Sequence, residues 1–252
     1  MYYVEKRNNG EKFTATDEYG LTWNYTYQDG KATNVYYESG DIESLNGIIN
    51  IPARLEGYPV VDLNNIYGGN IFVKLPEDEN TIVKQIKVPN SVTNIGYSAF
   101  YKCTGLTEIE ISNVESIENY AFSGCSGLTE INMQNVTRIE DNAFYECSSL
   151  ENIELPENLT VIEESMLNSC NSLKSIIIKN NVKEVKNGAF ANCISLSKIL
   201  IWNNVEELGY RTFDKWTSDQ TVKFEVKEIQ EGWDKNWNYN CNAEIIFGYT
   251  GE

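Results

Sequence analysis

Histidine is absent from all 252 residues of the chain. This absence excludes imidazole metal ligands, nucleophile triads built on histidine, and histidine proton shuttles. An enzyme with this sequence would have to work with carboxylates, lysine, tyrosine or thiols.

Long apolar runs are absent as well. No stretch of about 18 apolar residues occurs, so the sequence predicts no transmembrane segment. The first ten residues, MYYVEKRNNG, lack the apolar core of a signal peptide. From this start alone we expect either a cytosolic protein or a mature fragment that carries a new Met1.

Basic residues are scarce. The chain has 20 Lys and Arg against 37 Asp and Glu, which gives a formal net charge of −17. Because binding to phosphates requires clustered Lys and Arg, nucleic acid is excluded as a partner, and an anionic membrane surface is disfavoured. Neutral or basic surfaces, glycans and cations are the remaining partner classes. With 41% hydrophobic residues, the chain has a globular rather than a disordered composition.

What the sequence does contain is a repeat of 22 or 23 residues. Each copy has a cysteine and, three positions later, the leucine that begins a Leu-x-x-Ile-x-Ile pattern, which predicts a short strand with its apolar side chains turned inward. A strand this short buries that face only when coils stack on a shared core, and this period indicates leucine-rich repeats. The cysteines that mark the period are Cys103, Cys125, Cys147, Cys170 and Cys193.

The one-residue variation in period falls in the turn after the strand. The turns ISNV (111–114) and MQNV (133–136) have two linking residues, whereas LPENL (155–159), IKNNV (178–182) and IWNNV (201–205) have three. An insertion confined to a turn is expected to leave the stacked core in register.

Two ladders of equivalent side chains follow from stacking. We expect the cysteines to form a buried column of free thiols, because free cysteine behaves as a small hydrophobe. Disulfides between coils are the alternative, and a metal site is disfavoured because a straight column does not converge on one point. Cys241 lies outside the array, and its exposure stays open. The amides of a second ladder are expected to satisfy backbone groups of neighbouring coils: Asn113, Asn135, Asn158, Asn181 and Asn204.

The segments AFSGCSGLTEI (121–131) and LPENLTVIEESML (155–167) resemble the BspA-type leucine-rich repeats of bacterial proteins. GIINIPARLEGYPVVDL (47–63) is similar to the entry repeat of that family, and EGWDKNWNYNCNAEIIFGYTGE (231–252) to its closing segment. The resemblance covers roughly residues 21–252. It implies a right-handed solenoid and a role in extracellular or cell-surface binding and adhesion by gut or oral bacteria.

We therefore predict an α/β solenoid, dominated by β structure, with about seven coils of 22–23 residues and β caps at both ends. The predicted divisions are an N-terminal β cap (1–46), an entry and degenerate repeat (47–82), regular repeats (83–215) and a C-terminal β cap (216–252). In the first cap, alternating residues around Asp29–Gly30 predict a hairpin.

The C-terminal cap is predicted from TVKFEVKEI (221–229) and AEIIFGY (243–249), which indicate two strands. Trp233 and Trp237 lie between them. The side chains of these tryptophans either cover the last coil or form a ligand platform, and we favour the covering role.

Three columns of outward side chains are predicted on the strand face, because neighbouring residues of a strand point to opposite sides. The face is acidic in the middle coils and becomes apolar and basic toward the C-terminal end. The first column is Gln85, Glu108, Glu130, Asn152, Ser175 and Lys198. The second is Lys87, Glu110, Asn132, Glu154, Ile177 and Leu200. The third is Pro89, Ser112, Gln134, Pro156, Lys179 and Trp202.

Ile177, Leu200 and Trp202 come from adjacent coils, with Lys179 and Lys198 beside them. Exposed apolar residues with a tryptophan are typical of an interaction site. The alternative is that the C-terminal cap or the Met166–Leu167 region folds over them.

The acidic candidates are Glu108, Glu110, Glu130 and Glu154. Glu108 and Glu130 are expected about 5 Å apart on adjacent strands, a spacing that fits the two carboxylates of a retaining glycosidase. A solvated acidic face explains them with fewer assumptions, and weak Ca²⁺ binding is intermediate.

The function predicted from the sequence is a non-catalytic, monomeric binding or adhesion module that presents its strand face to a protein or glycan partner. We expect no cofactor and no metal site. The alternatives are a carboxylate-based enzyme acting on glycans and a structural surface protein.

Overall fold

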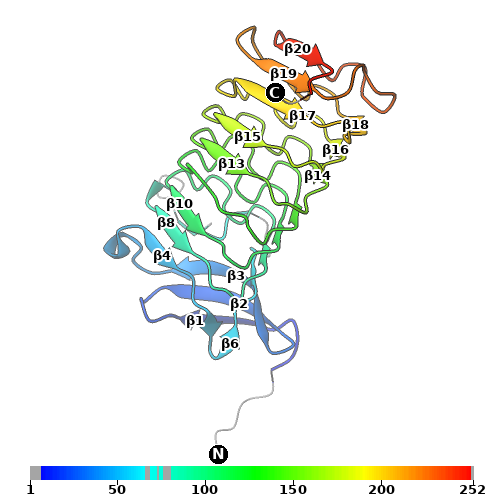
Figure 1. The fold of residues 1–252 in the computed structure, drawn as a ribbon. Helices are drawn as coiled ribbons and strands as arrows, with labels where there is room; N and C mark the ends of the chain where they lie inside the picture. Colours follow the sequence, from blue (N-terminus) through cyan, green and yellow to red (C-terminus); the bar gives the residue numbers. More distant parts are fainter. Residues whose placement is uncertain (1–6, 66–68, 73, 76–80, 251–252) are drawn as a thin grey trace, which may run out of the picture.

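The computed structural model describes residues 7–65, 69–72, 74–75 and 81–250. It is an elongated stack of about seven coils, with the N-terminal sheet at one end and β20 at the other (Figure 1). Strands and turns make up nearly all of the described chain, whose one helical element is the 3-10 turn η1 (Glu43–Leu45). The predicted β-dominated solenoid is confirmed.

The N-terminal end is an antiparallel sheet of three strands, β1 (Lys12–Thr16), β2 (Thr22–Gln28) and β3 (Lys31–Ser39). The turn between β2 and β3 is Asp29–Gly30, and both residues have positive φ, 47° and 77°, as a two-residue hairpin turn requires. The predicted hairpin is therefore confirmed. Because β3 pairs with the first coil through Val35 and Leu63, the hairpin covers what would be an open sheet edge.

Each coil contributes one strand to the strand face, where β8 and β10 align Ile86 with Ile109 and Gln85 with Glu108. Three residues separate the first coil's strand from a small hairpin of β5 (Arg54–Leu55) and β6 (Tyr58–Pro59), where Tyr58 packs against Tyr27 of the N-terminal sheet. The strands of the face form three groups: β4 (Ile48–Asn50), β8 (Gln85–Lys87) and β10 (Glu108–Glu110); β13 (Asn152–Glu154) and β15 (Ser175–Ile177); and β17 (Lys198–Ile201), β19 (Thr221–Phe224) and β20 (Glu244–Phe247).

A second row of two-residue strands runs along the other side of the coils (Figure 1). All of its pairings are parallel. The row has two parts, of which the first joins the N-terminal sheet: β7 (Asp62–Leu63), β9 (Asn94–Ile95), β11 (Ser116–Ile117) and β12 (Arg138–Ile139), then β14 (Val161–Ile162), β16 (Glu184–Val185) and β18 (Glu207–Leu208).

One continuous apolar core fills the space between the two rows of strands. Phenyl rings at the same position of successive coils stack, with centroids 5.2 Å apart for Phe100 and Phe122 and 5.4 Å apart for Phe122 and Phe144. Met166 takes the ring's place in the next coil and is fully buried. Full burial of each such side chain contributes about 1.5–3 kcal/mol, so the repeated apolar letters of the sequence are the main source of stability.

The five ladder cysteines are free and fully buried, which confirms the predicted column of thiols. The thiol of Cys125 donates to the carbonyl of Phe100 (3.1 Å), and the thiols of the next three coils donate in the same way. Burial raises the pKa of Cys103 and Cys193 to about 12. Cys241 is also free and is half-buried.

The asparagine ladder binds backbone carbonyls one coil earlier at four of its five positions. The Nδ2 of Asn113 donates to Asn90 (3.0 Å) and that of Asn135 to Ser112 (2.6 Å). Asn181 and Asn204 donate similarly. These side chains are exposed or half-buried, so they stabilise surface turns rather than buried ones.

The C-terminal end confirms the two predicted strands as β19 and β20, which pair in parallel. Trp233 and Trp237 are 6% and 3% exposed, and their rings lie 4.7 and 5.3 Å from that of Phe224. Such burial leaves little ring surface for a ligand. The tryptophans cover the last coil.

Candidate functional site

The strand face exposes most of the side chains predicted to point outward. Glu108, Glu110, Glu130 and Glu154 are exposed, while the alternate positions, such as Ile109, are buried. The third column matches the prediction only in part, because Ser112 and Gln134 are exposed but the other members are not. Its members Pro156, Lys179 and Trp202 are buried or half-buried, because the chain leaves the strand and turns at this position.

Three of the four predicted carboxylates have polar partners on neighbouring coils. Glu108 accepts a hydrogen bond from Gln85 (2.6 Å), Glu110 forms an ion pair with Lys87 (3.1 Å), and Glu154 forms one with Lys179 (2.9 Å). Exposed pairs of this kind contribute at most about 1 kcal/mol. Within the part of the chain that the structure describes, no cluster of three or more Cys, Asp or Glu side chains could hold a metal ion.

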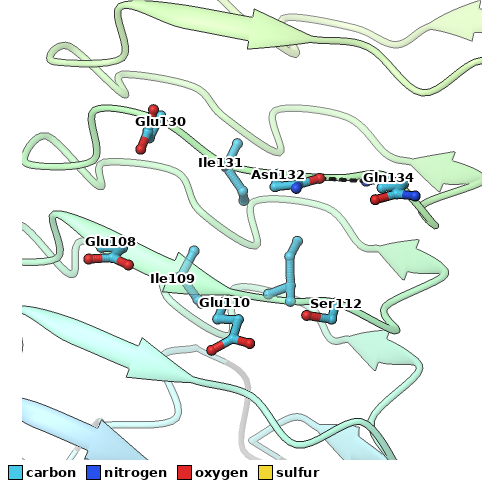
Figure 2. Close-up of a pocket in the computed structure, with 9 residues that line it drawn as sticks. Glu108, Ile109, Glu110, Ser112, Glu130, Ile131, Asn132 and Gln134 are labelled. Carbon is cyan, nitrogen blue, oxygen red and sulfur yellow. Dashed lines mark hydrogen bonds between the residues drawn. The ribbon is translucent and has the colours of Figure 1, made fainter.

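Glu108 and Glu130 border a hollow of about 430 Å³ on the strand face. Figure 2 shows the two carboxylates one above the other on successive coils, with Asn132 and Gln134 farther along the upper one. The side-chain oxygen of Asn132 accepts a hydrogen bond from the backbone N–H of Gln134 (3.1 Å). This hollow lies on the open face of the stack and is polar at its rim, so a ligand there would contact carboxylates and amides.

The strand predicted around Ile131 is not formed. Although Ile131 and Met133 are buried, residues 130–133 take part in no strand pairing in the described structure, and the strand face is interrupted between β10 and β13. The second row is interrupted in the same coil, between β12 and β14. We call residues 130–158, where both interruptions meet, the seam.

Turn length accounts for the seam. It joins a coil with the shorter turn (133–136) to one with the longer turn (155–159), and a hollow of about 770 Å³ lies between these two turns. On the cysteine side the coils remain bonded, since the N–H of Phe144 donates to the carbonyl of Met166 at 3.0 Å. The extra residue therefore spreads the coils apart along the strand rows and leaves the core in register.

At the C-terminal end, Ile177 on β15 is 59% exposed and Leu200 on β17 is half-buried. Trp202 is half-buried against the core, and its indole N–H donates to the carbonyl of Ile178 (2.6 Å). Lys198 is exposed, while Lys179 leans toward the preceding coil and its ion pair with Glu154. The structure brings these residues onto one region of the face, with Ile177 as its most exposed apolar member and Trp202 as a partly structural one.

Comparison of the sequence with known families finds six copies of the BspA type leucine rich repeat region, in matches over residues 79–193, 105–220 and 133–243. Together these matches cover more than half of the chain. It belongs to the BspA-type leucine-rich repeat family. The search of curated proteins found no match.

Solved structures of other leucine-rich repeat proteins share the fold of this BspA-type chain. A leucine rich cell surface protein from Faecalibacterium prausnitzii is 26% identical, with a TM-score of 0.70 over 89% of this chain and 57% of that one. This chain thus spans little more than half of that protein. A leucine-rich repeat protein from Bacteroides ovatus is 24% identical, with a TM-score of 0.56 over 98% of this chain and 71% of that one. A leucine rich repeat protein from T. pallidum is 20% identical, with a TM-score of 0.53 over 72% of this chain and 90% of that one.

The strand face of the BspA-type repeats is predictable from the pattern within one repeat, but the seam is not. The change in turn length from MQNV to LPENL is the sequence feature that marks the seam, but it predicts only that the core stays in register.

Among the described residues, no helix has the length and apolar character needed to cross a bilayer.

Proposed function

We propose that this chain is a non-catalytic binding module that presents its strand face to a protein or glycan partner outside the cell or at its surface. The observation that carries the proposal is the 59% exposure of Ile177 on the strand face, beside Leu200 and Lys198. Single exposed aliphatic residues are common on protein surfaces, but Ile177 lies with Leu200 and Trp202 on one region of the face, and such a group is typical of a binding site. Aliphatic contacts favour a protein partner over a glycan.

Three further observations support this choice. The family consists of repeat proteins, and the F. prausnitzii structure is that of a cell surface protein. The net charge of −17 favours a neutral or basic partner. The carboxylates of the face are exposed and mostly paired with Lys or Gln, as expected for a solvated rim around a binding site.

The chain offers a matched pair of variants to test this site. Ile177 on the face and Ile194 in a turn off the face are exposed to nearly the same extent, 59% and 57%. Wild type, Ile177→Asp and Ile194→Asp would be screened against arrays of extracellular-matrix proteins and glycans. We expect a partner that is lost with Ile177→Asp and retained with Ile194→Asp. Equal binding by both variants would contradict the proposed site. Trp202→Ala is less informative, because the indole also holds the fold.

The second candidate function is a carboxylate-based enzyme acting on glycans, favoured by the adjacent Glu108 and Glu130 at a hollow (Figure 2). Hydrolysis of a polysaccharide that is abolished by both Glu108→Gln and Glu130→Gln would establish the enzyme and overturn the binding module. A structural surface protein, the third candidate, predicts concentration-dependent self-association, whereas we propose a monomer.

A further inference from the structure

A second surface lies apart from the strand face, in the turns that lead from each cysteine into the strand. There the structure has a groove of about 420 Å³ that runs across successive coils. Its lining includes the hydroxyl side chains of Thr104, Ser126 and Ser148, with Lys102 and Glu146 along its side. No aliphatic side chain lines it.

The three hydroxyls stand at the same position of three successive coils, directly after Cys103, Cys125 and Cys147. In a stack of parallel coils, neighbouring copies of one position are about 5 Å apart. Within the described part of the chain, the hydroxyls of Thr104, Ser126 and Ser148 have no hydrogen-bond partner in the protein. The groove therefore offers a row of free donors and acceptors along the solenoid axis.

Tyrosines adjoin the charged residues that line the groove, although no tyrosine of the described chain is itself part of its lining. Tyr101, next to Lys102, is 36% exposed, and the Lys102 ammonium lies 5.2 Å from the centre of its ring. Two coils on, Tyr145 contacts the carboxylate of Glu146. Burial and this carboxylate raise the pKa of Tyr145, with smaller contributions from Tyr101 and Tyr120.

A notch separates Tyr101 from Tyr145, because the coil between them has Ser123 and Gly124 at the equivalent positions. Gly124 has a φ of +75°, and a Cβ there would lie 3.0 Å from Cγ of Lys102. A larger residue would therefore be strained and would displace the lysine. Tyr120, 36% exposed, and Tyr97, 47% exposed, extend this group of tyrosines, with their rings 6.0 Å apart.

Exposed tyrosine faces beside rows of hydroxyls match the two kinds of surface that a sugar presents. The C–H groups of a pyranose ring pack on the electron-rich face of an aromatic ring, and its hydroxyls exchange hydrogen bonds with serine, threonine and carboxylate groups. A protein partner would need a desolvated apolar centre, which the polar lining does not supply. An anionic ligand would be repelled by the net charge of −17.

We propose that this groove binds an extended, neutral glycan chain that lies along the solenoid axis, one sugar residue per coil. The coil spacing is close to the advance per residue of a flat β-1,4-linked chain, so each sugar would lie beside the hydroxyl of one coil, with opposite edges of the sugar facing the row in alternate residues. The tyrosines hold the chain laterally. This site is independent of the strand-face function proposed above.

Isothermal titration with cello- and chito-oligosaccharides tests the proposal. Affinity should rise from disaccharide to tetrasaccharide and level off at the hexasaccharide, because the groove crosses a limited number of coils. Maltohexaose, whose chain is curved, should bind at least about tenfold more weakly, since it meets fewer equivalent hydroxyls. Absence of binding by every β-1,4-linked chain, or equal binding of maltohexaose, would overturn the proposal.

Variants locate the site. Tyr101→Ala and Tyr145→Ala should each weaken tetrasaccharide binding by up to about tenfold, the size of one aromatic contact. Ser126→Val tests the hydroxyl row without removing a ring, and it should also weaken binding. The matched control is Tyr210→Ala, a tyrosine exposed as much as Tyr101 (38% against 36%) but on a later coil that the groove does not reach, and it should leave binding unchanged. Ile177→Asp should also leave binding unchanged, which separates this site from the strand face. Equal effects of the groove and control variants would contradict the assignment.

Discussion

The coils before the seam and the coils after it differ by one residue. Cys103, Cys125 and Cys147 are 22 residues apart, whereas Cys147, Cys170 and Cys193 are 23 apart. The earlier coils have a continuous row of stacked phenyl rings and pair their strands through β12; the later ones have Met166 in that row and form separate sheets. Core burial is nearly the same in both groups. The change in turn length thus coincides with the coil at which both strand rows of the described structure are interrupted, while the repeated apolar residues make the coils stack.

The largest expected effect is on the chemical reactivity of the buried cysteines, which both groups of coils contain. A pKa of about 12 for Cys103 and Cys193, raised from 9.0 by burial, lowers the thiolate fraction near pH 8 by about a thousandfold. A thiol-specific chromogenic reagent should therefore modify only Cys241 in the native protein and all six thiols after denaturation. Rapid modification of Cys170 or Cys193 alone would break the comparison, because it would mean that the later coils open more readily.

The next largest effect separates the two groups by their cores. Phe122→Ala removes a ring stacked on both sides, and it should lower the free energy of unfolding by about 3–5 kcal/mol. Met166→Ala, at the same position after the seam, should lower it by less, toward the lower end of about 2–5 kcal/mol, because the methionine side chain is smaller than a phenyl ring. Chemical denaturation of both variants measures the difference. If Met166→Ala lowered the free energy of unfolding more than Phe122→Ala does, the core of the later coils would contribute more to stability than that of the earlier ones.

A smaller change in stability is expected when the turn itself is altered. Insertion of one asparagine between Gln134 and Asn135 converts the 22-residue coil into one of 23. Since loop insertions cost little, the free energy of unfolding should change by no more than about 1 kcal/mol. Strand pairing should then form between residues 130–133 and β13, and the interruption should move one coil earlier. Amide exchange that is unchanged around residue 131 in this variant would contradict the role of turn length.

The solenoid fold was predictable from the sequence because the residue at each repeated position has one physical role. The burial of Cys125, the inward position of Ile109 and the hairpin at Asp29–Gly30 all follow from local pattern. The ring row and the amides of the asparagine ladder follow from stacking. A period of 22–23 residues leaves few other ways to bury a short apolar strand.

The candidate sites were less predictable, because they depend on how coils differ from one another. Alternation predicted that Trp202 points outward, but the indole bonds back to Ile178 where the strand ends. The unformed strand at Ile131 depends on the turn lengths of two coils compared together. The groove beside Tyr101 depends on small residues in the following coil. Each of these features depends on contacts between neighbouring repeats. The residue pattern within a single repeat therefore does not predict them.

Amide hydrogen exchange, resolved by residue, tests the central claim that the change in turn length interrupts both strand rows at the seam. We predict that the amides of Ile131, Asn132 and Met133 exchange at least about tenfold faster than those of Ile109 and Ile153, because residues 130–133 form no strand whereas β10 and β13 do. Equal protection of all three coils would contradict the account, since it would mean that the strand face is continuous across the seam.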